Sequence, residues 1–232
     1  MDLTTAKVII TGGSTGIGYE TAKLLISKGA KVVICARNKT DVEKAAKELG
    51  AIGVQTDVSD EEEVKTLFKN AIAALGGLNV VINNAGIGYL ASLTATTVKD
   101  FTQVWEINVK GAFLVGQQAA KHFVEQNEGN IINISSTAGL KGFATGTAYC
   151  ASKFAVSAMT ECWRAELRKN NIRVMQVNPS EVVTPFATKL GYEATKVDQK
   201  LKPSEIAHTI AAMLEMNNVG FITDATVWAT NP

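Results

Sequence analysis

Seven short apolar runs are spread along the chain, separated by polar or glycine-containing segments. Most of them contain many β-branched residues and do not alternate polar with apolar positions. This pattern is typical of strands that are buried on both faces of a parallel sheet. The expected strands span residues 7–11, 31–36, 52–56, 78–82, 129–136, 172–178 and 225–229.

Between these runs, apolar positions recur at helical spacing. The first expected helix follows the glycine-rich stretch and ends at Gly29, and another begins near Ser59. The other expected helices span residues 41–49, 97–126, 149–169 and 203–216. The stretch 181–202 has no strong periodicity and is predicted to be a mobile connection, long enough to form a substrate loop. Alternating strands and helices indicate an α/β fold. We expect a single Rossmann-type doubly wound domain over residues 1–232, with a seven-stranded parallel sheet, helices on both faces and the ligand at the strand carboxyl ends.

The composition of the chain limits the classes of molecule that it is expected to bind. The 232 residues are 46% hydrophobic and 19% charged, with a formal net charge of +1, which fits neither a nucleic-acid binder nor a disordered chain. No apolar run reaches the ~20 residues of a membrane span, and no cleavable signal segment precedes the first strand, so we expect a cytoplasmic protein. Small molecules and copies of the chain itself are the expected partners.

Neither the cysteines nor the histidines match a ligand or disulfide pattern. Cys35, Cys150 and Cys162 are odd in number and form no CxxC motif, so we expect reduced thiols. His122 and His208 lie far apart and match no metal-ligand spacing. We therefore expect no metal site.

A glycine-rich turn follows the first predicted strand. Its sequence is GGSTGIG, and Gly12, Gly16 and Gly18 stand where the strand passes into a helix. Glycines let the backbone come close to a phosphate, and the N–H groups of a helix N-terminus attract it. A simple tight turn is the alternative, but the strand-to-helix context favours a dinucleotide phosphate site.

Arg37 stands at the end of the second predicted strand, where a dinucleotide fold contacts the adenosine ribose. An acidic residue there would bind the 2′-hydroxyl of NAD, whereas an arginine accommodates the 2′-phosphate of NADP. The chain carries Ala36 and Arg37 and no carboxylate, which favours NADP over NAD. The alternative is an exposed arginine at a helix entrance.

Three asparagines stand at notable positions. Asn83 and Asn84 follow the fourth predicted strand, where amides either brace neighbouring loops or line a cofactor cleft, and both roles can hold together. Asn108 lies within the predicted helix 97–126, where an amide is unfavourable and can distort the hydrogen-bond ladder. It is therefore either exposed or has a specific buried task.

The stretch 133–153 carries the candidate catalytic groups. Ser135 and Ser136 end the fifth apolar run, and Tyr149 and Lys153 begin the next helix. Residues four apart share one helix face. A lysine ammonium beside a phenol lowers the pKa of the phenol from about 10 toward working pH, as a general acid or base needs. The alternative is a surface lysine, a half-buried tyrosine and a serine-rich turn.

Taken together, these motifs resemble the short-chain dehydrogenase/reductase family, and most closely its 3-oxoacyl-(acyl-carrier-protein) reductase-type members. The resemblance covers nearly the whole chain. It rests on Gly12-x-x-x-Gly16-x-Gly18, Asp57-Val58, Asn83-Asn84-Ala85-Gly86, Asn108, Ser136 and Tyr149-x-x-x-Lys153. The interval to Tyr149 that is usual in the family selects Ser136 over Ser135.

The resemblance implies a role for each catalytic residue. Tyr149 would donate a proton to a substrate carbonyl oxygen while hydride leaves the nicotinamide, and Ser136 would hold that oxygen. Lys153 would lower the pKa of Tyr149 and bind the nicotinamide ribose, and Asn108 would anchor a water that joins Lys153 to a proton relay. The cofactor-binding residues it implies are Gly12, Ser14, Thr15, Gly16, Ile17, Gly18, Arg37, Asp57, Val58, Asn84, Ala85, Gly86, Tyr149, Lys153, Val182 and Thr184.

Three departures from the family pattern qualify these expectations. Pro179-Ser180 replaces the usual Pro-Gly beside the nicotinamide, and Thr15 replaces a basic residue that is often found in NADP-dependent members. The chain ends in TVWATNP rather than in the Val-Asp-Gly-Gly segment that often builds a tetramer interface. A homodimer is therefore expected alongside a homotetramer.

The leading hypothesis is an NADP(H)-dependent oxidoreductase that interconverts a carbonyl and a secondary alcohol by hydride transfer, most like a 3-oxoacyl thioester reductase. One alternative is a sugar, polyol or pteridine-type oxidoreductase, because the sequence of the connection after Pro179 does not reveal its specificity. A second is a regulatory protein that binds NADP(H) without turnover, although the presence of Ser136, Tyr149 and Lys153 argues against it.

Overall fold

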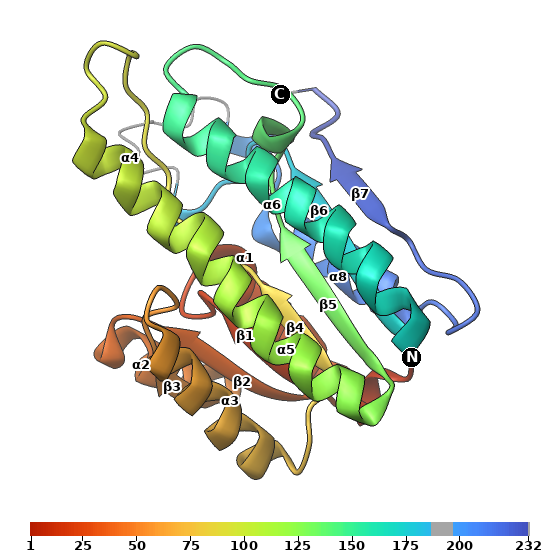
Figure 1. Ribbon diagram of the computed structural model, residues 1–232. Helices are drawn as coiled ribbons and strands as arrows, with labels where there is room; N and C mark the ends of the chain where they lie inside the picture. The colour runs from red at the N-terminus through yellow and green to blue at the C-terminus, as the bar shows by residue number, and fades with distance from the viewer. Residues whose placement is uncertain (187–196, 232) are drawn as a thin grey trace.

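The computed structural model describes residues 1–186 and 197–231. A seven-stranded parallel sheet runs through it in the order β3-β2-β1-β4-β5-β6-β7, with helices on both faces. The predicted doubly wound α/β fold is therefore confirmed (Figure 1). The strands are β1 Lys7–Thr11, β2 Lys31–Ala36, β3 Ile52–Gln55, β4 Val80–Asn83, β5 Gly129–Ile134, β6 Ile172–Pro179 and β7 Asp224–Val227.

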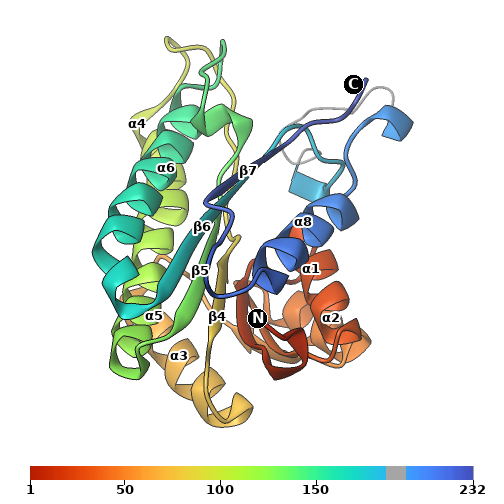
Figure 2. The ribbon, with the colours of Figure 1, turned by 90° about the vertical axis from the view of Figure 1, so that its right-hand side faces the viewer.

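The helices form two layers, one on each face of the sheet (Figure 2). One layer holds α1 Gly16–Ser27, α2 Lys39–Leu49 and α8 Pro203–Glu215. The other holds α3 Glu61–Leu75, α4 Val98–Trp105, α5 Ala112–Gln126 and α6 Thr147–Leu167. In the described part of the chain, no helix is both long enough and apolar enough to cross a membrane.

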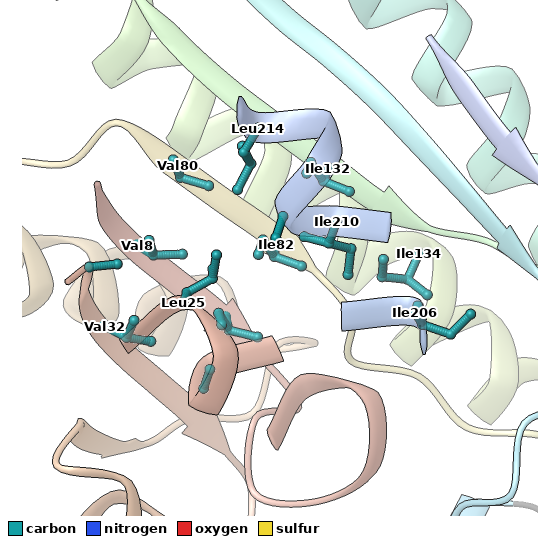
Figure 3. Packing of buried hydrophobic residues seen from close by; sticks show 14 of the residues in the cluster. Val8, Leu25, Val32, Val80, Ile82, Ile132, Ile134, Ile206, Ile210 and Leu214 are labelled. Atoms are coloured by element: carbon teal, nitrogen blue, oxygen red, sulfur yellow. The ribbon is translucent and has the colours of Figure 1, made fainter. Parts of the chain in front are cut away.

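The strand side chains divide between two buried clusters because successive residues point to opposite faces. Val8 and Ile10 of β1 face α1 and α8, where they join Leu25 and Ile210 (Figure 3). Ile9, which lies between them, faces the cluster built on α3 and α5. Both faces of the strands are therefore apolar, which explains why the sequence shows continuous apolar runs rather than alternation.

The helix predicted over 97–126 is interrupted. A π-helical turn, Glu106–Gly111, separates α4 from α5, and Asn108 lies within it. The expected distortion of the helix at this amide is thus present, and the side chain is buried with 2% of its surface exposed. π-Turns of this kind often occur at functional sites.

The two ends of the connection predicted over 181–202 are joined. Val182 and Leu201 form a parallel bridge, the backbone N–H of Val183 donates to the Leu201 oxygen at 2.9 Å, and Glu181 pairs with Lys200. Residues 187–196, in the middle of this predicted substrate loop, lie outside the described residues. The described ends of this connection are therefore held to each other.

Candidate active site

A cavity of about 960 Å³ opens at the carboxyl ends of the central strands. Parallel strands place their carboxyl ends at the same edge of a sheet, and ligands of such folds bind there. Most of the predicted cofactor-binding residues line this cavity. They are Gly12, Ser14, Thr15, Gly16, Ile17, Arg37, Asn84, Ala85, Gly86, Tyr149, Lys153, Val182 and Thr184.

Three of the predicted cofactor-binding residues do not line the cavity. Gly18 packs against the Gly12 oxygen of the glycine-rich turn, and Val58 is buried against Gly111. The Asp57 carboxylate accepts hydrogen bonds from the backbone and hydroxyl of Ser59, at 2.9 and 2.7 Å. The structure therefore does not bring these three residues into the cavity.

The glycine-rich turn between β1 and α1 has no room for a side chain at Gly12, Gly13 or Gly18. A Cβ on Gly18 would lie 2.5 Å from the Gly12 oxygen, and one on Gly12, whose φ is +64°, would lie 2.9 Å from the Ala85 Cα. The Asn84 amide braces this turn by donating to the Thr11 and Gly12 oxygens at 2.9 and 3.1 Å. Because Asn84 also lines the cavity, it both braces a loop and forms part of the cleft.

The turn and its surroundings fit a dinucleotide phosphate. The N-cap residue of α1, Thr15, makes no side-chain hydrogen bond to the helix, so the first N–H groups of α1 are not capped from within the turn. Arg37 follows β2, is exposed and borders the same cavity. A helix N-terminus and a guanidinium that line the same cavity are suited to phosphate groups.

Tyr149, Lys153 and Ser136 meet in the cavity. Tyr149 lies in the first turn of α6 and Lys153 one turn further along, with its Nζ 5.8 Å from the centroid of the Tyr149 ring. Ser136 follows β5, and its hydroxyl accepts a hydrogen bond from the Ala138 backbone at 3.1 Å. Ser135, by contrast, is buried and donates to the Lys153 backbone oxygen at 3.2 Å. The geometry thus favours Ser136 as the serine that reaches a ligand.

The electrostatics of the pair differ from the expectation. Burial raises the pKa of Tyr149 to about 12, and hydrogen bonding with Ser136 offsets only part of this rise. Burial also lowers the pKa of Lys153 to about 8, because a low-dielectric site disfavours the charged form of each group. The lowering of the Tyr149 pKa by Lys153 is therefore not seen, and the Lys153 ammonium donates instead to the Ile134 oxygen at 2.9 Å.

Asn108 holds the loop after β4 to α6. Its amide accepts from the Ile87 N–H and donates to the Ile87 oxygen, both at 2.8 Å, and it also donates to the Ser152 hydroxyl at 3.0 Å. Ser152 in turn donates to the Tyr149 backbone oxygen at 2.7 Å. The π-turn thus supplies the amide that ties the cavity wall to the helix of the candidate catalytic residues.

Replacing Asn108 by alanine is expected to lower the free energy of unfolding by about 2 kcal/mol, because the Ile87 N–H and oxygen lose their partners in a partly buried position. Urea unfolding of the variant measures this loss. The exposed Asn217 is the control, and its alanine variant should unfold like the unmodified chain. An equal, small effect at both positions would contradict the structural role of Asn108.

Sequence reasoning missed two parts of the site. Ser152 precedes Lys153 as an ordinary small residue in a helix, and no local signal marks it as the partner of Asn108. The mouth of the cavity contains Phe186, whose ring lies 5.8 Å from that of Tyr149, and Trp228, which follows β7. Residues 225–229 were predicted as a strand, and no local signal marked Trp228 as a cavity residue. In residues 1–186 and 197–231, no group of three or more acidic, histidine or cysteine side chains could hold a metal ion.

Comparison with known proteins agrees with this geometry. The family model for short chain dehydrogenases matches residues 6–194. An uncharacterized oxidoreductase of Staphylococcus aureus strain USA300 is 36% identical over 211 residues, which cover 90% of both chains.

Two solved structures of ketoreductases show a similar fold. The 3-ketoacyl-(acyl-carrier-protein) reductase of Brucella melitensis, complexed with NADH, has a TM-score of 0.90 at 29% identity, covering 96% of each chain. A variant of actinorhodin polyketide ketoreductase with NADPH has a TM-score of 0.90 at 28% identity, covering 99% of this chain and 98% of its own. The glycine-rich turn, the Ser136–Tyr149–Lys153 cluster and these matches together identify the chain as an oxidoreductase that belongs to the short-chain dehydrogenase/reductase family.

Proposed function

We propose that this protein reduces a ketone to a secondary alcohol with NADPH, and that its substrate is similar to a 3-oxoacyl thioester. The observation that carries the proposal is the presence of Ser136, Tyr149 and Lys153 in one cavity with the glycine-rich turn. The two ketoreductase structures support carbonyl reduction as the reaction class. When bound, the nicotinamide supplies the hydride.

In this mechanism the residues of the chain hold the substrate and move the proton. The Ser136 hydroxyl donates a hydrogen bond to the ketone oxygen, and the Tyr149 hydroxyl transfers its proton to that oxygen as the alcohol forms. With its pKa raised to about 12, Tyr149 is protonated at neutral pH, which is the form that a proton donor requires. The Lys153 ammonium stabilises the phenolate that remains.

The test is NADPH consumption with the N-acetylcysteamine thioester of 3-oxobutanoic acid, followed by a panel of aldehydes, ketones, sugars and pterins. Oxidation of NADPH that depends on the thioester supports the proposal. Activity on a sugar or a pterin alone would replace the thioester with the alternative substrate class. Tight NADPH binding without turnover of any carbonyl compound would favour a regulatory role.

Arg37 is the residue proposed to select NADPH. Its replacement by alanine is expected to weaken NADPH binding by about 1.5 to 3 kcal/mol, because a charge-assisted contact with the 2′-phosphate is lost, and to change NADH binding much less. Titration of cofactor fluorescence measures both affinities. Lys39 is the control, because it is an exposed cation nearby that does not line the cavity. Its alanine variant should leave the ratio of NADPH affinity to NADH affinity unchanged. Equal losses for both cofactors in the Arg37 variant would remove it as the selector.

We further propose that the chain forms a homo-oligomer, either a homodimer or a homotetramer. Phe101 and Trp105 of α4, Phe113 of α5 and Phe154 of α6 are large apolar side chains that are 36–46% exposed, and these three helices belong to one layer (Figure 2). An outward-facing group of aromatic residues is typical of a protein–protein interface.

A further inference from the structure

Three large apolar side chains line the cavity and remain exposed. They are Leu140, Phe143 and Trp228, which are 52%, 51% and 63% exposed. Scattered exposed apolar residues are ordinary, but a group of them in a cavity indicates a surface that becomes covered by a ligand. We call these three residues the apolar wall.

The apolar wall is assembled from segments that are distant in the sequence. Leu140 and Phe143 lie between β5 and α6, and Trp228 follows β7. Both segments follow the carboxyl ends of their strands and therefore lie at the same end of the sheet (Figure 2). The loop that carries Phe143 is held by the Ala91 N–H, which donates to the Thr145 oxygen at 2.9 Å. This hydrogen bond joins the segment that carries Phe143 to the segment between β4 and α4.

The wall lies on the substrate side of the cavity. In the strand order β2-β1-β4-β5-β6-β7, the glycine-rich turn and Arg37 belong to β1 and β2, whereas the wall belongs to β5 and β7. Phe186 also lines the cavity, and its ring centroid lies 5.8 Å from that of Tyr149. The proposed proton donor therefore has an apolar ring beside it, in the cavity that the wall also lines.

We propose that the apolar wall binds an alkyl chain of the substrate, and that Trp228 determines the preference for chain length. This inference rests on the proposed ketone reduction and names the group that extends from the ketone. Burial of the chain against Leu140, Phe143 and Trp228 removes apolar surface from water on both partners. A polyol would place hydroxyl groups against these three side chains, so the wall disfavours the sugar and polyol alternative.

The test compares the 3-oxobutanoyl and 3-oxodecanoyl thioesters of N-acetylcysteamine. A fully buried methylene contributes roughly a factor of four to affinity, and one covered on a single side roughly a factor of two. We therefore expect kcat/KM to rise about 2-fold with each added methylene. In the Trp228→Ala variant, kcat/KM should fall about 5- to 10-fold for the decanoyl substrate and less than about 2-fold for the butanoyl substrate.

The control variant is Leu93→Ala. Leu93 is 76% exposed but does not line the cavity. Its removal should therefore leave kcat/KM unchanged for both the butanoyl and the decanoyl substrate. Equal kcat/KM values for the two thioesters in the unmodified protein would overturn the proposal, as would a loss in the Trp228 variant that is the same for both substrates.

A binding measurement separates this proposal from the reaction itself. The 3-hydroxydecanoyl thioester should quench tryptophan fluorescence in the unmodified protein and in Trp105→Phe, and the Trp228→Phe variant should lose the quenching. If this pattern holds while no thioester is reduced, the apolar wall stands and the proposed reaction fails. If both thioesters are reduced without quenching at Trp228, the reaction stands and the wall fails.

Discussion

Replacing Tyr149 by phenylalanine is expected to lower kcat for ketone reduction by about 10²- to 10⁴-fold, the usual contribution of a general acid. The substitution removes only the hydroxyl group and keeps the ring that packs against Phe186 at 5.8 Å. The fold and the cofactor site should therefore persist. The loss reflects the missing proton, because the ketone oxygen then becomes an alkoxide in a site without its nearest acid.

Two measurements check this result. NADPH consumption with the 3-oxobutanoyl thioester gives kcat, and titration of NADPH fluorescence gives the cofactor affinity, which should change less than about 3-fold. Tyr19→Phe is the matched control, because Tyr19 contacts Glu48 at 3.3 Å and does not line the cavity. A Tyr149→Phe variant with nearly full activity would show that another group supplies the proton.

Replacing Lys153 by methionine is expected to abolish reduction and, at neutral pH, to stabilise the folded chain. Burial lowers the pKa of Lys153 to about 8 from its ordinary value of 10.5, so at pH 7 the folded protein holds a buried ammonium that would be more stable in water. Removing it should raise the free energy of unfolding by about 1 to 3 kcal/mol. The gain stays below the full desolvation cost because the Ile134 oxygen loses the hydrogen bond that it accepts from Lys153.

The pH dependence of this gain has a defined sign. Below about pH 8, Lys153 is protonated in both the folded and the unfolded state, and the folded protein bears the full cost of burying the ammonium. Between pH 8 and 10.5 the unfolded chain binds more protons than the folded one, so the unmodified protein becomes more stable as the pH rises. The advantage of the Lys153→Met variant should therefore be largest at pH 7 and shrink toward pH 10.5.

Urea unfolding of both proteins at pH 7 and at pH 10 measures this effect. Lys69→Met is the control, because Lys69 lies exposed on α3, and its substitution should change neither stability nor activity. A Lys153→Met variant that is less stable at pH 7 would show that the hydrogen bond to Ile134 outweighs the burial of the charge. Full activity of the variant would remove Lys153 from the proposed mechanism.

Much of the fold could be predicted because its signals are local. The run KVIIT became β1 with the expected limits Lys7–Thr11, and KVVICA became β2, Lys31–Ala36. Some strand limits differ from the prediction. β4 begins at Val80 rather than at residue 78, and the Asn79 side chain just before it accepts a hydrogen bond from the Lys7 N–H at 2.8 Å. Such shifts depend on contacts between segments distant in the sequence.

The candidate site could be predicted only in part. Spacing alone placed Tyr149 and Lys153 on one helix face, and this follows from helix geometry. The pKa of Tyr149 could not be predicted from the sequence. Burial raises it to about 12, and the depth of burial depends on the three-dimensional packing around α6. Trp228 could likewise not be predicted as a cavity residue, since its place there depends on the pairing of β7 with β6.

The π-turn at Glu106–Gly111 has a consequence for anyone who redesigns this protein. A π-turn accommodates one residue more than the α-helical turn it replaces, and each residue of an α-helix rotates the following side chains by about 100°. Shortening this segment by one residue would thus produce a regular helix but would turn α4 relative to α5, whose Val115, Ala119 and Phe123 are completely buried. The extra residue changes the rotation of α4 relative to α5. The apolar face of α5 can therefore pack against the sheet while the Asn108 amide bonds to the loop after β4.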